Sequence, residues 1–454
     1  MKYIFLSLLS LLLFFFGSAQ SDDAAFIKSI SDNILTSKSS YNNLHHLTKK
    51  VGARLAGSKQ MVMAEQWGYK ALQAAGADTV YFQECRVPVW QRGGTDKAHV
   101  VTPKGKRPLQ VVALGNTLGS GKAGVKAPVV VVKNWADLEA RKDNIKGKIV
   151  FYSVGFDERH VRTFQAYSES VQYRGAGASR AAKYGAVAVI VRSMSHSNDN
   201  FPHTGSVNYN DSFPKIPAVA IGLRDAAYLD SFASNSNTVV ELFTYGRTLP
   251  DTIGNNVIAE LKGTLHPEKI ITLGGHLDSW DNCEGAHDDG AGIVQTIEVL
   301  RAFKELGYRP KHTIRFVFFA NEENGLRGGR KYAEEAKRKN EQHVFALESD
   351  AGGFTPRGFS FSGPESSWSK LLSWKELLAP YYGDQFSKGG GGADIGPLAR
   401  TMNVPVAGLL PDSQRYFDVH HAANDTFESV NFRELNLGAI NMAALVYLVD
   451  QYGL

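Results

Sequence analysis

This sequence has very little cysteine and no large excess of charge of one sign. Only 2 of the 454 residues are cysteine, which excludes a small fold held together by several disulfides. The 50 Lys and Arg nearly balance the 45 Asp and Glu without forming a basic block, so we expect no nucleic-acid partner. With 43% hydrophobic residues, the chain is neither disordered nor collagen-like. Whether Cys85 and Cys283 pair stays open, and by default both are small buried hydrophobic residues.

Long apolar runs are also missing, except at the N-terminus. There Lys2 precedes an apolar or small stretch over residues 3–16, and Gly17, Ser18 and Ala19 follow. The stretch is shorter than the ~20 residues that a membrane helix needs, and small residues stand where a signal peptidase cuts. We predict a signal peptide over residues 1–19 and an exported protein without a membrane segment after cleavage; a membrane anchor is the alternative.

The length suggests two to four domains of roughly 100–200 residues each. The pattern of apolar and polar residues changes along the chain. Residues 24–47 and 62–75 have helix-like patterns. Between residues 97 and 245, Val- and Ile-rich runs predict a β-rich unit with a few helices, with strands at 128–132, 147–152, 186–191 and 216–221. This unit holds no tight cluster of His, Cys and carboxylates, so we expect it to bind or shape rather than to react.

From residue 255 onward, strand and helix patterns alternate, which is typical of a mostly parallel sheet covered by helices on both faces. The predicted strands are 257–261, 270–273, 314–320, 344–347 and 404–409, and the clearest helices are 291–306 and 435–452. The predicted fold class is therefore α/β, with a mostly parallel mixed sheet flanked by helices. In such sheets, ligands bind at the carboxyl ends of the strands.

Acidic residues and histidines gather where these strands end. The segments are GGHLDSW with His276 and Asp278, HDDGAG with His287, Asp288 and Asp289, NEENG with Glu322 and Glu323, ESDAGG with Glu348 and Asp350, and HHAANDT with His420, His421 and Asp425. Taken singly, each has an ordinary explanation: His276 as a satisfied histidine, Asp288 as a helix N-cap, and the adjacent glutamates as a solvated loop. If these carboxylates and histidines are buried together, the desolvation of each charged group costs several kcal/mol unless a cation neutralises the carboxylates.

The segments therefore predict a metal centre. Histidine and carboxylate ligands without cysteine favour a zinc-type ion, and the number of carboxylates favours two ions with Asp288 as the bridge. Glu322 and Glu323 leave the strand in different directions, so one can bind metal while the other takes a proton from the attacking water.

In order and nearly in spacing, four runs of residues 255–454 resemble the co-catalytic dizinc aminopeptidases and glutamate-carboxypeptidase-like peptidases. These runs are GGHLDSWDNCEGAHDDGAG, FFANEENGLRGG, ESDAGG and HHAANDT. The segments HLDSWD and GGADIGPL resemble those of the glutamate-carboxypeptidase-like branch. The resemblance implies a zinc exopeptidase fold made of residues 20–96 and 247–454, and an inserted protease-associated domain at 97–246.

The resemblance also implies roles for the metal ligands. His276 and Asp350 would hold one of two Zn²⁺ ions, Glu323 and His421 the other, and Asp288 would bridge both. In the family, the last histidine ligand usually lies four residues before an Asp or Glu followed by Thr, which selects His421 over its neighbour.

Three further residues receive roles in the same way. Glu322 would be the general base, and Asp278 would orient the imidazole of His276. His420 would contact the substrate carbonyl and stabilise its developing negative charge.

The expected activity is zinc-dependent exopeptidase hydrolysis of dipeptides or short peptides with a free N-terminus. The chain departs from the family at GGGGADIGP, where Asp394 stands without the usual histidine, so no side-chain preference is transferred. Gly389 to Gly392 is either a flexible turn or a wall close to the substrate. The alternatives are a non-catalytic binding protein on the same scaffold and a glutaminyl-cyclase-like metalloenzyme. A homodimer also stays open.

Overall fold

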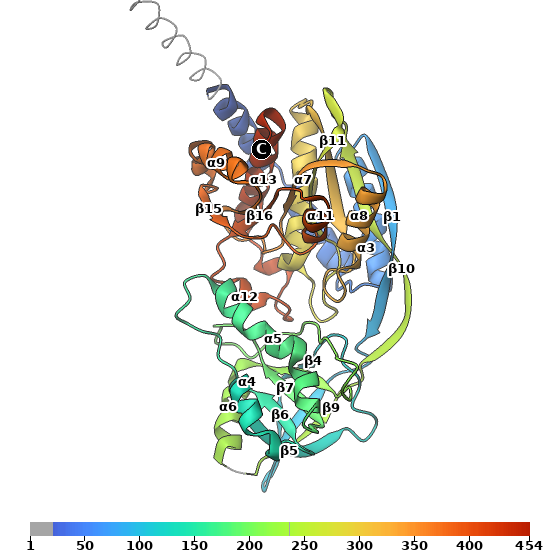
Figure 1. Cartoon of the computed structure of the whole chain (residues 1–454), viewed down its shortest axis with the longest axis vertical. Helices are drawn as coiled ribbons and strands as arrows, with labels where there is room; N and C mark the ends of the chain where they lie inside the picture. The colour runs from blue at the N-terminus through green and yellow to red at the C-terminus, as the bar shows by residue number, and fades with distance from the viewer. Residues whose placement is uncertain (1–20, 236) are drawn as a thin grey trace, which may run out of the picture.

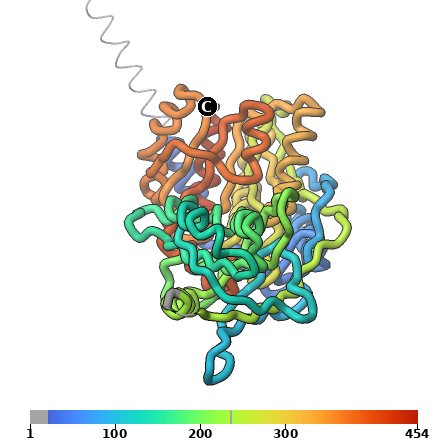
Figure 2. The backbone as a smooth tube through the Cα atoms, turned by 60° about the horizontal axis from the view of Figure 1, so that its bottom comes forward, coloured from blue at the N-terminus to red at the C-terminus, as the bar shows by residue number. Residues whose placement is uncertain are grey.

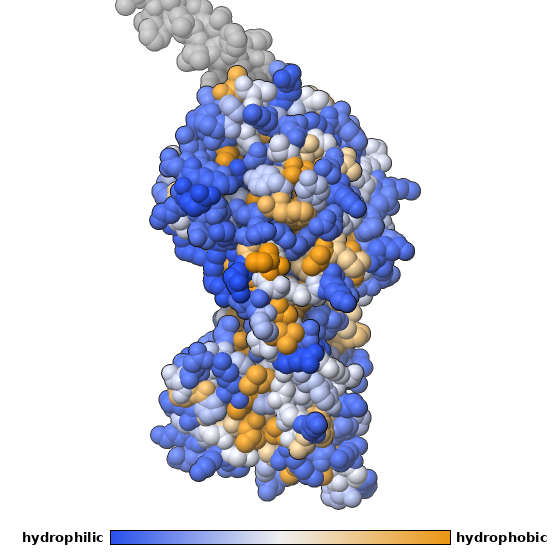
Figure 3. Space-filling model, turned by 90° about the vertical axis from the view of Figure 1, so that its right-hand side faces the viewer, coloured by the Kyte–Doolittle hydropathy of each residue, from blue (hydrophilic) through white to orange (hydrophobic). Residues whose placement is uncertain are grey.

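Two lobes, each built on an eight-stranded sheet, make up the computed structural model, which describes residues 21–235 and 237–454 (Figure 1). The predicted signal peptide lies outside the described residues. Figure 2 shows the green and teal second lobe in front of the first, and Figure 3 shows the constriction that separates the larger lobe from the smaller one. No helix of the described residues combines the length and apolar character needed to cross a membrane.

The sheet of the first lobe is mixed. Its strands lie in the order β1 (Thr79–Gln91), β10 (Arg247–Leu261), β12 (His312–Phe319), β11 (His266–His276), β13 (Gln342–Glu348), β16 (Val406–Pro411), β14 (Pro356–Ser362) and β15 (Gln385–Lys388). The central strands β12, β11, β13 and β16 run parallel, while β1, β10 and β14 pair antiparallel with their neighbours β10, β12 and β16. The predicted α/β class with helices on both faces is confirmed.

Helices cover both faces of this sheet because its central strands are apolar on both sides. On β12, Phe316 and Phe318 pack into the core shared with α3 (Lys59–Ala74), α7 (Ala291–Glu305) and α13 (Phe432–Tyr452), with α2 (Ser39–His45) beyond, against α7 and α13. Val317 and Phe319 alternate with them and face α8 (Arg327–Arg338) and α11 (Gly396–Met402). Shorter helices, among them α9 (Glu365–Ser373) and α12 (Tyr416–Val419), complete the lobe.

The second lobe also has a mixed sheet. Its strands lie in the order β3 (Gly105–Leu109), β2 (Lys97–Thr102), β9 (Val239–Phe243), β5 (Val125–Val132), β6 (Ile149–Tyr152), β7 (Ala188–Arg192), β8 (Ala218–Ile221) and β4 (Val111–Ala113). The four predicted strands correspond to β5 to β8, and the helices are α4 (Trp135–Ala140), α5 (Thr163–Ala182) and α6 (Leu223–Asn235). Its assignment as a protease-associated domain, with boundaries at 97 and 246, stays a prediction.

The long antiparallel pair of β1 and β10 escaped the sequence analysis. Thr79 pairs with Glu260 and Gln91 with Arg247, so the second lobe is inserted between two strands of the first sheet. All six side chains of β1 from Thr79 to Glu84 are at least partly exposed, so this half of the strand lacks the clear alternation by which a half-buried strand is recognised.

Both cysteines are free and buried, as the default interpretation held. Cys85 lies in the main core of the first lobe. Cys283 packs with Leu55, Trp90 and Trp280 in a separate small cluster.

Candidate metal centre

The carboxyl ends of three adjacent parallel strands bring the predicted ligands together. His276 ends β11, Glu323 follows β12, and Asp350 follows β13. Asp288 lies in the turn that precedes α7, and His421 lies in the loop after α12. The arrangement follows from the parallel order of β12, β11 and β13, which places their carboxyl ends at one edge of the sheet.

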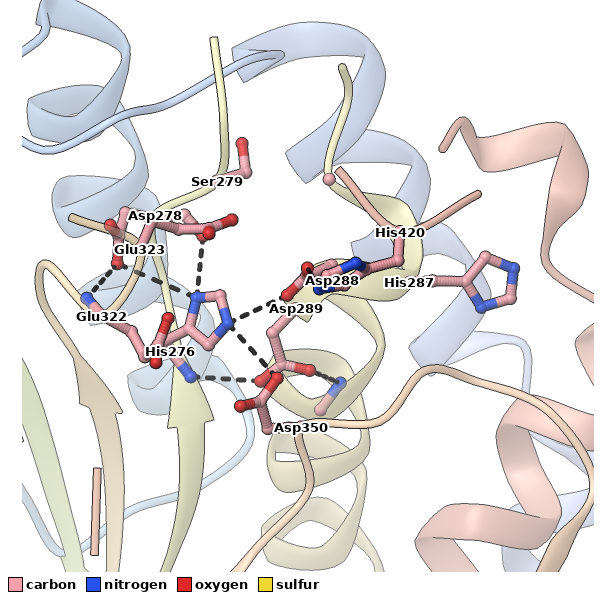
Figure 4. Close-up of polar contacts among 12 residues, drawn as sticks. His276, Asp278, Ser279, His287, Asp288, Asp289, Glu322, Glu323, Asp350 and His420 are labelled. Carbon is pink, nitrogen blue, oxygen red and sulfur yellow. Dashed lines mark hydrogen bonds and ion pairs between the residues drawn. The ribbon is translucent and has the colours of Figure 1, made fainter. Parts of the chain in front are cut away.

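Asp288 stands between two pairs of potential ligands. Its Oδ1 is 3.1 Å from Nε2 of His276, which in turn is 3.4 Å from Oδ1 of Asp350 (Figure 4). Its Oδ2 is 3.1 Å from Nε2 of His421, which is 3.1 Å from Oε2 of Glu323. Two half-sites, each with one imidazole and one carboxylate of its own, therefore share the carboxylate of Asp288.

The electrostatics of this cluster favour a bound cation. Burial, with the charge of Asp288, raises the pKa of Glu323 to about 7, although His421 opposes the shift. Burial and the charge of Asp288 also raise the pKa of Asp350 against the opposing effect of His276. Oε1 of Glu323 and Oδ2 of Asp288 are buried and accept no hydrogen bond of good geometry from the described residues. A bound divalent cation would remove the repulsion between these buried carboxylates. The imidazole nitrogens and carboxylate oxygens of the cluster are the kinds of ligand that zinc binds.

His420 and His421 differ in what they contact. Their rings stack with centroids 3.6 Å apart, and Nε2 of His420 is 3.6 Å from Oδ2 of Asp288. His421 reaches both Asp288 and Glu323, whereas His420 is surrounded by the rings of Tyr416, Phe417 and Tyr167. The choice of His421 as ligand therefore has geometric support, although the ligand atoms of Asp288, His420 and His421 also lie within 4.8 Å of one another.

Asp278 supports the site differently from the expected way. The carbonyl oxygen of Asp278 accepts a hydrogen bond from Nδ1 of His276 at 3.0 Å, while its carboxylate Oδ1 is 3.8 Å from that nitrogen. The carboxylate Oδ1 instead accepts from the backbone amide of Glu322 at 3.0 Å. Asp278 thus orients the imidazole through its backbone and positions the predicted base through its side chain.

Glu322 lies beside these groups, and none of the described residues forms an ion pair with it. Burial raises its pKa well above the usual value; His276 opposes the shift, and the charges of Asp350 and Glu323 add to it. A carboxylate with a raised pKa is suited to accept and return a proton near neutral pH.

The other polar residues of the HDDGAG segment have structural roles. Asp289, and not Asp288, contacts the start of α7, since its Oδ1 accepts from the Gly292 amide at 3.0 Å. His287 points away from the cluster and stacks on Phe354 at 4.2 Å (Figure 4). Asp425 accepts hydrogen bonds from the amides of His287 and Asp288 and so holds the bridging aspartate in place.

At two of the four glycines of residues 389–392, Gly391 and Gly392, the backbone approaches its neighbours so closely that a side chain would not fit. A Cβ on Gly392 would lie 2.2 Å from the carboxyl carbon of Glu348, and one on Gly391 would lie 2.8 Å from Ile395. Gly389 and Gly390 line a groove of about 670 Å³ between the start of α5 and strands β14 to β16.

Sequence reasoning missed Arg54, which lies in none of the motifs. Its side chain is buried, and it donates to the carbonyl oxygens of Leu277, Glu284 and Gly285, at both ends of the segment between His276 and Asp288. These contacts span more than 200 residues of chain, so no local pattern could reveal them.

One expectation for the second lobe is wrong. Asp157, His160 and Glu169 bring three potential ligand atoms within 4.8 Å of one another. They were overlooked because eight residues lie between His160 and Glu169, and only the course of the chain into α5 brings the two side chains together. Asp157 is already paired with the guanidinium of Arg159 at 2.5 Å, so the group is an ordinary set of surface ion pairs.

Comparison with known proteins gives relatives across nearly the whole chain. Residues 256–446 match Peptidase family M28. Carboxypeptidase Q from Homo sapiens is 36% identical over 411 residues, covering 90% of this chain and 85% of that protein, and carboxypeptidase Q from Mus musculus is 35% identical over the same shares. A crystal structure of a peptidase M28 precursor from Shewanella amazonensis SB2B superposes with a TM-score of 0.90 at 32% identity, covering 95% and 97% of the two chains. The resemblance that the motifs predicted is confirmed.

Proposed function

The chain belongs to peptidase family M28, and on that premise we propose that it is an exported dizinc exopeptidase that hydrolyses dipeptides and short peptides with a free N-terminus. Membership makes it a metallopeptidase that acts on peptides. The number of ions, the exopeptidase specificity and the export are the proposal.

The observation that carries the proposal is the pair of half-sites around Asp288. His276 with Asp350 would hold one zinc ion, and His421 with Glu323 the other, because each imidazole lies 3.1 to 3.4 Å from both its own carboxylate and Asp288. Two ions sharing one carboxylate lower the pKa of a water molecule and polarise a peptide carbonyl when they are bound.

The chain's own residues would manage the proton and the substrate. Glu322 would accept a proton from the attacking water and pass it to the leaving amine, since its carboxylate is free of ion pairs within the described residues. His420, beside Asp288 and within its aromatic surroundings, would stabilise the negative charge that develops on the substrate carbonyl oxygen.

The proposal is tested with one dipeptide prepared in four forms: free, N-acetylated, C-amidated and blocked at both ends. Each form is incubated with zinc-loaded and with chelator-treated protein. We expect chelator-sensitive cleavage that N-acetylation abolishes; a further loss on C-amidation would identify a dipeptidase. Absence of cleavage of every form, with zinc confirmed bound, would refute the proposal and favour a binding protein or a cyclising enzyme.

A further inference from the structure

The two histidines of the candidate centre are held by different lobes. Nδ1 of His276 donates to the carbonyl of Asp278, within the first lobe. Nδ1 of His421 lies 3.3 Å from the carbonyl oxygen of Thr204, across the lobe boundary, and donates to it when Nε2 binds metal. Because a histidine that binds a metal through Nε2 carries its proton on Nδ1, each ring needs such an acceptor.

Thr204 also holds the backbone of His421. Its amide donates to the carbonyl oxygen of His421 at 3.0 Å, and Nδ2 of Asn282 donates to the same oxygen at 3.2 Å. His421 has a φ of +61°, a left-handed conformation that costs of order 1–3 kcal/mol for a residue other than glycine. The contacts from Thr204 and Asn282 stabilise this conformation and with it the direction of the imidazole.

Arg174 of α5 completes this contact from the same lobe. Its NH1 lies 3.3 Å from the Thr204 carbonyl oxygen and 3.3 Å from Nδ1 of His421, and its NH2 donates to the hydroxyl of Tyr167 at 2.6 Å. The guanidinium is packed against Gly205, where a Cβ would come within 2.3 Å of Cζ. Arg174 can only donate, so when Nδ1 of His421 carries the proton that metal binding through Nε2 requires, the hydrogen bond of NH1 goes to the Thr204 carbonyl and fixes the acceptor that His421 uses.

The Thr204 segment is anchored to the sheet of its own lobe. The hydroxyl of Thr204 donates to the carbonyl of Ala113 at 2.9 Å, at the end of β4, and the amide of Gly115 donates to the carbonyl of Gly205 at 2.9 Å. The loop that carries the acceptor for His421 is therefore fixed to its own lobe by these hydrogen bonds.

We propose that Thr204 and Arg174 are positioning residues for His421, so that the half-site of His421 and Glu323 depends on the second lobe while the half-site of His276 and Asp350 does not. The inference rests on the proposed dizinc function. It gives the second lobe a part in metal binding beyond any effect on access to the site.

Two variants and a control test this assignment. Arg174→Met removes the guanidinium, and Thr204→Val keeps the shape of the side chain but removes the hydroxyl anchor to Ala113. Arg192→Met is the control, because Arg192 belongs to the same lobe and donates to the Ser193 carbonyl, without a described contact to His421. Thermal unfolding of each metal-free variant verifies that it is folded.

Metal-free protein is titrated calorimetrically with zinc, and the stoichiometry and both affinities are measured. We expect the wild type and Arg192→Met to bind two ions alike. Arg174→Met and Thr204→Val should retain the first affinity and bind the second ion about 10- to 100-fold more weakly, as for other lost partners of metal-ligating histidines.

The inference is overturned if both variants bind two ions as the wild type does, or if they lose both affinities equally. Full zinc occupancy with only a changed KM also overturns it, since Arg174 would then act on the substrate. A wild-type protein that binds a single ion refutes the proposed dizinc centre itself, so the two failures are distinguishable.

Discussion

Replacing Arg54 by Met tests whether a buried cation holds the segment between His276 and Asp288. The side chain of Arg54 is fully buried, and none of the described residues forms an ion pair with it. Its guanidinium donates to Leu277 at 2.6 Å, Glu284 at 2.7 Å and Gly285 at 3.0 Å.

The magnitude follows from what the substitution leaves behind. Three carbonyl oxygens lose a charged donor, and each buried acceptor without a partner costs about 1–3 kcal/mol. Part of this lost stability is recovered, because the variant no longer has to bury a cation whose desolvation costs several kcal/mol. We therefore expect Arg54→Met to lower the free energy of unfolding by about 3 kcal/mol and to weaken zinc binding, since the segment that presents Asp288 loses its anchor.

Urea denaturation of the metal-free protein, followed by tryptophan fluorescence, measures the effect. Arg338→Met is the matched control, because the Arg338 side chain is 64% exposed and pairs with Glu335 at the surface; we expect it to change stability by less than about 1 kcal/mol. A loss for Arg54→Met no larger than that of the control, with unchanged zinc affinity, would refute the anchoring role.

Three further predictions concern the base, the charge of the cluster and the contact between lobes. Glu322→Gln should keep zinc and lose turnover at least about 100-fold, measured as kcat beside zinc content; substantial residual activity would exclude Glu322 as the base. Burial raises the pKa of Glu323 and of Asp425 to about 7 in the metal-free protein. Because these folded values exceed the unfolded ones, the two carboxyls contribute stability that is lost as the pH rises from about 4 to 7, and zinc should restore it at the upper end; burial lowers the pKa of His203 to about 3 and of His287 to about 4, which opposes this trend, so a Glu323→Gln variant that keeps the wild-type dependence of Tm on pH in the presence of chelator would contradict the assignment. Gly115→Ala should destabilise by about 1–3 kcal/mol, because its Cβ would lie 1.9 Å from the ring of Trp280 in the other lobe, whereas Gly155→Ala has open space and should leave Tm unchanged.

Local patterns predicted the central elements of the first lobe well. The apolar run 314–320 is β12, and the stripe at 291–306 is α7, because strands and helices buried against one core have strong periodicity. The pair of β1 and β10 was missed, since its stability comes from pairing across 155 intervening residues, numbers 92 to 246, and not from its own pattern.

The sequence by itself determined the ligand types and their places at strand ends, and these were enough for the family and the metal class. Only the tertiary structure decided how those ligands are oriented. In it the His276 ring contacts the backbone of Asp278 rather than its carboxylate, Asp289 contacts the start of α7, and the His421 ring contacts Thr204 of the other lobe. The physical reason is that a ligand's identity belongs to one residue, whereas its orientation depends on hydrogen bonds with backbone atoms that any residue carries and that only the fold brings near.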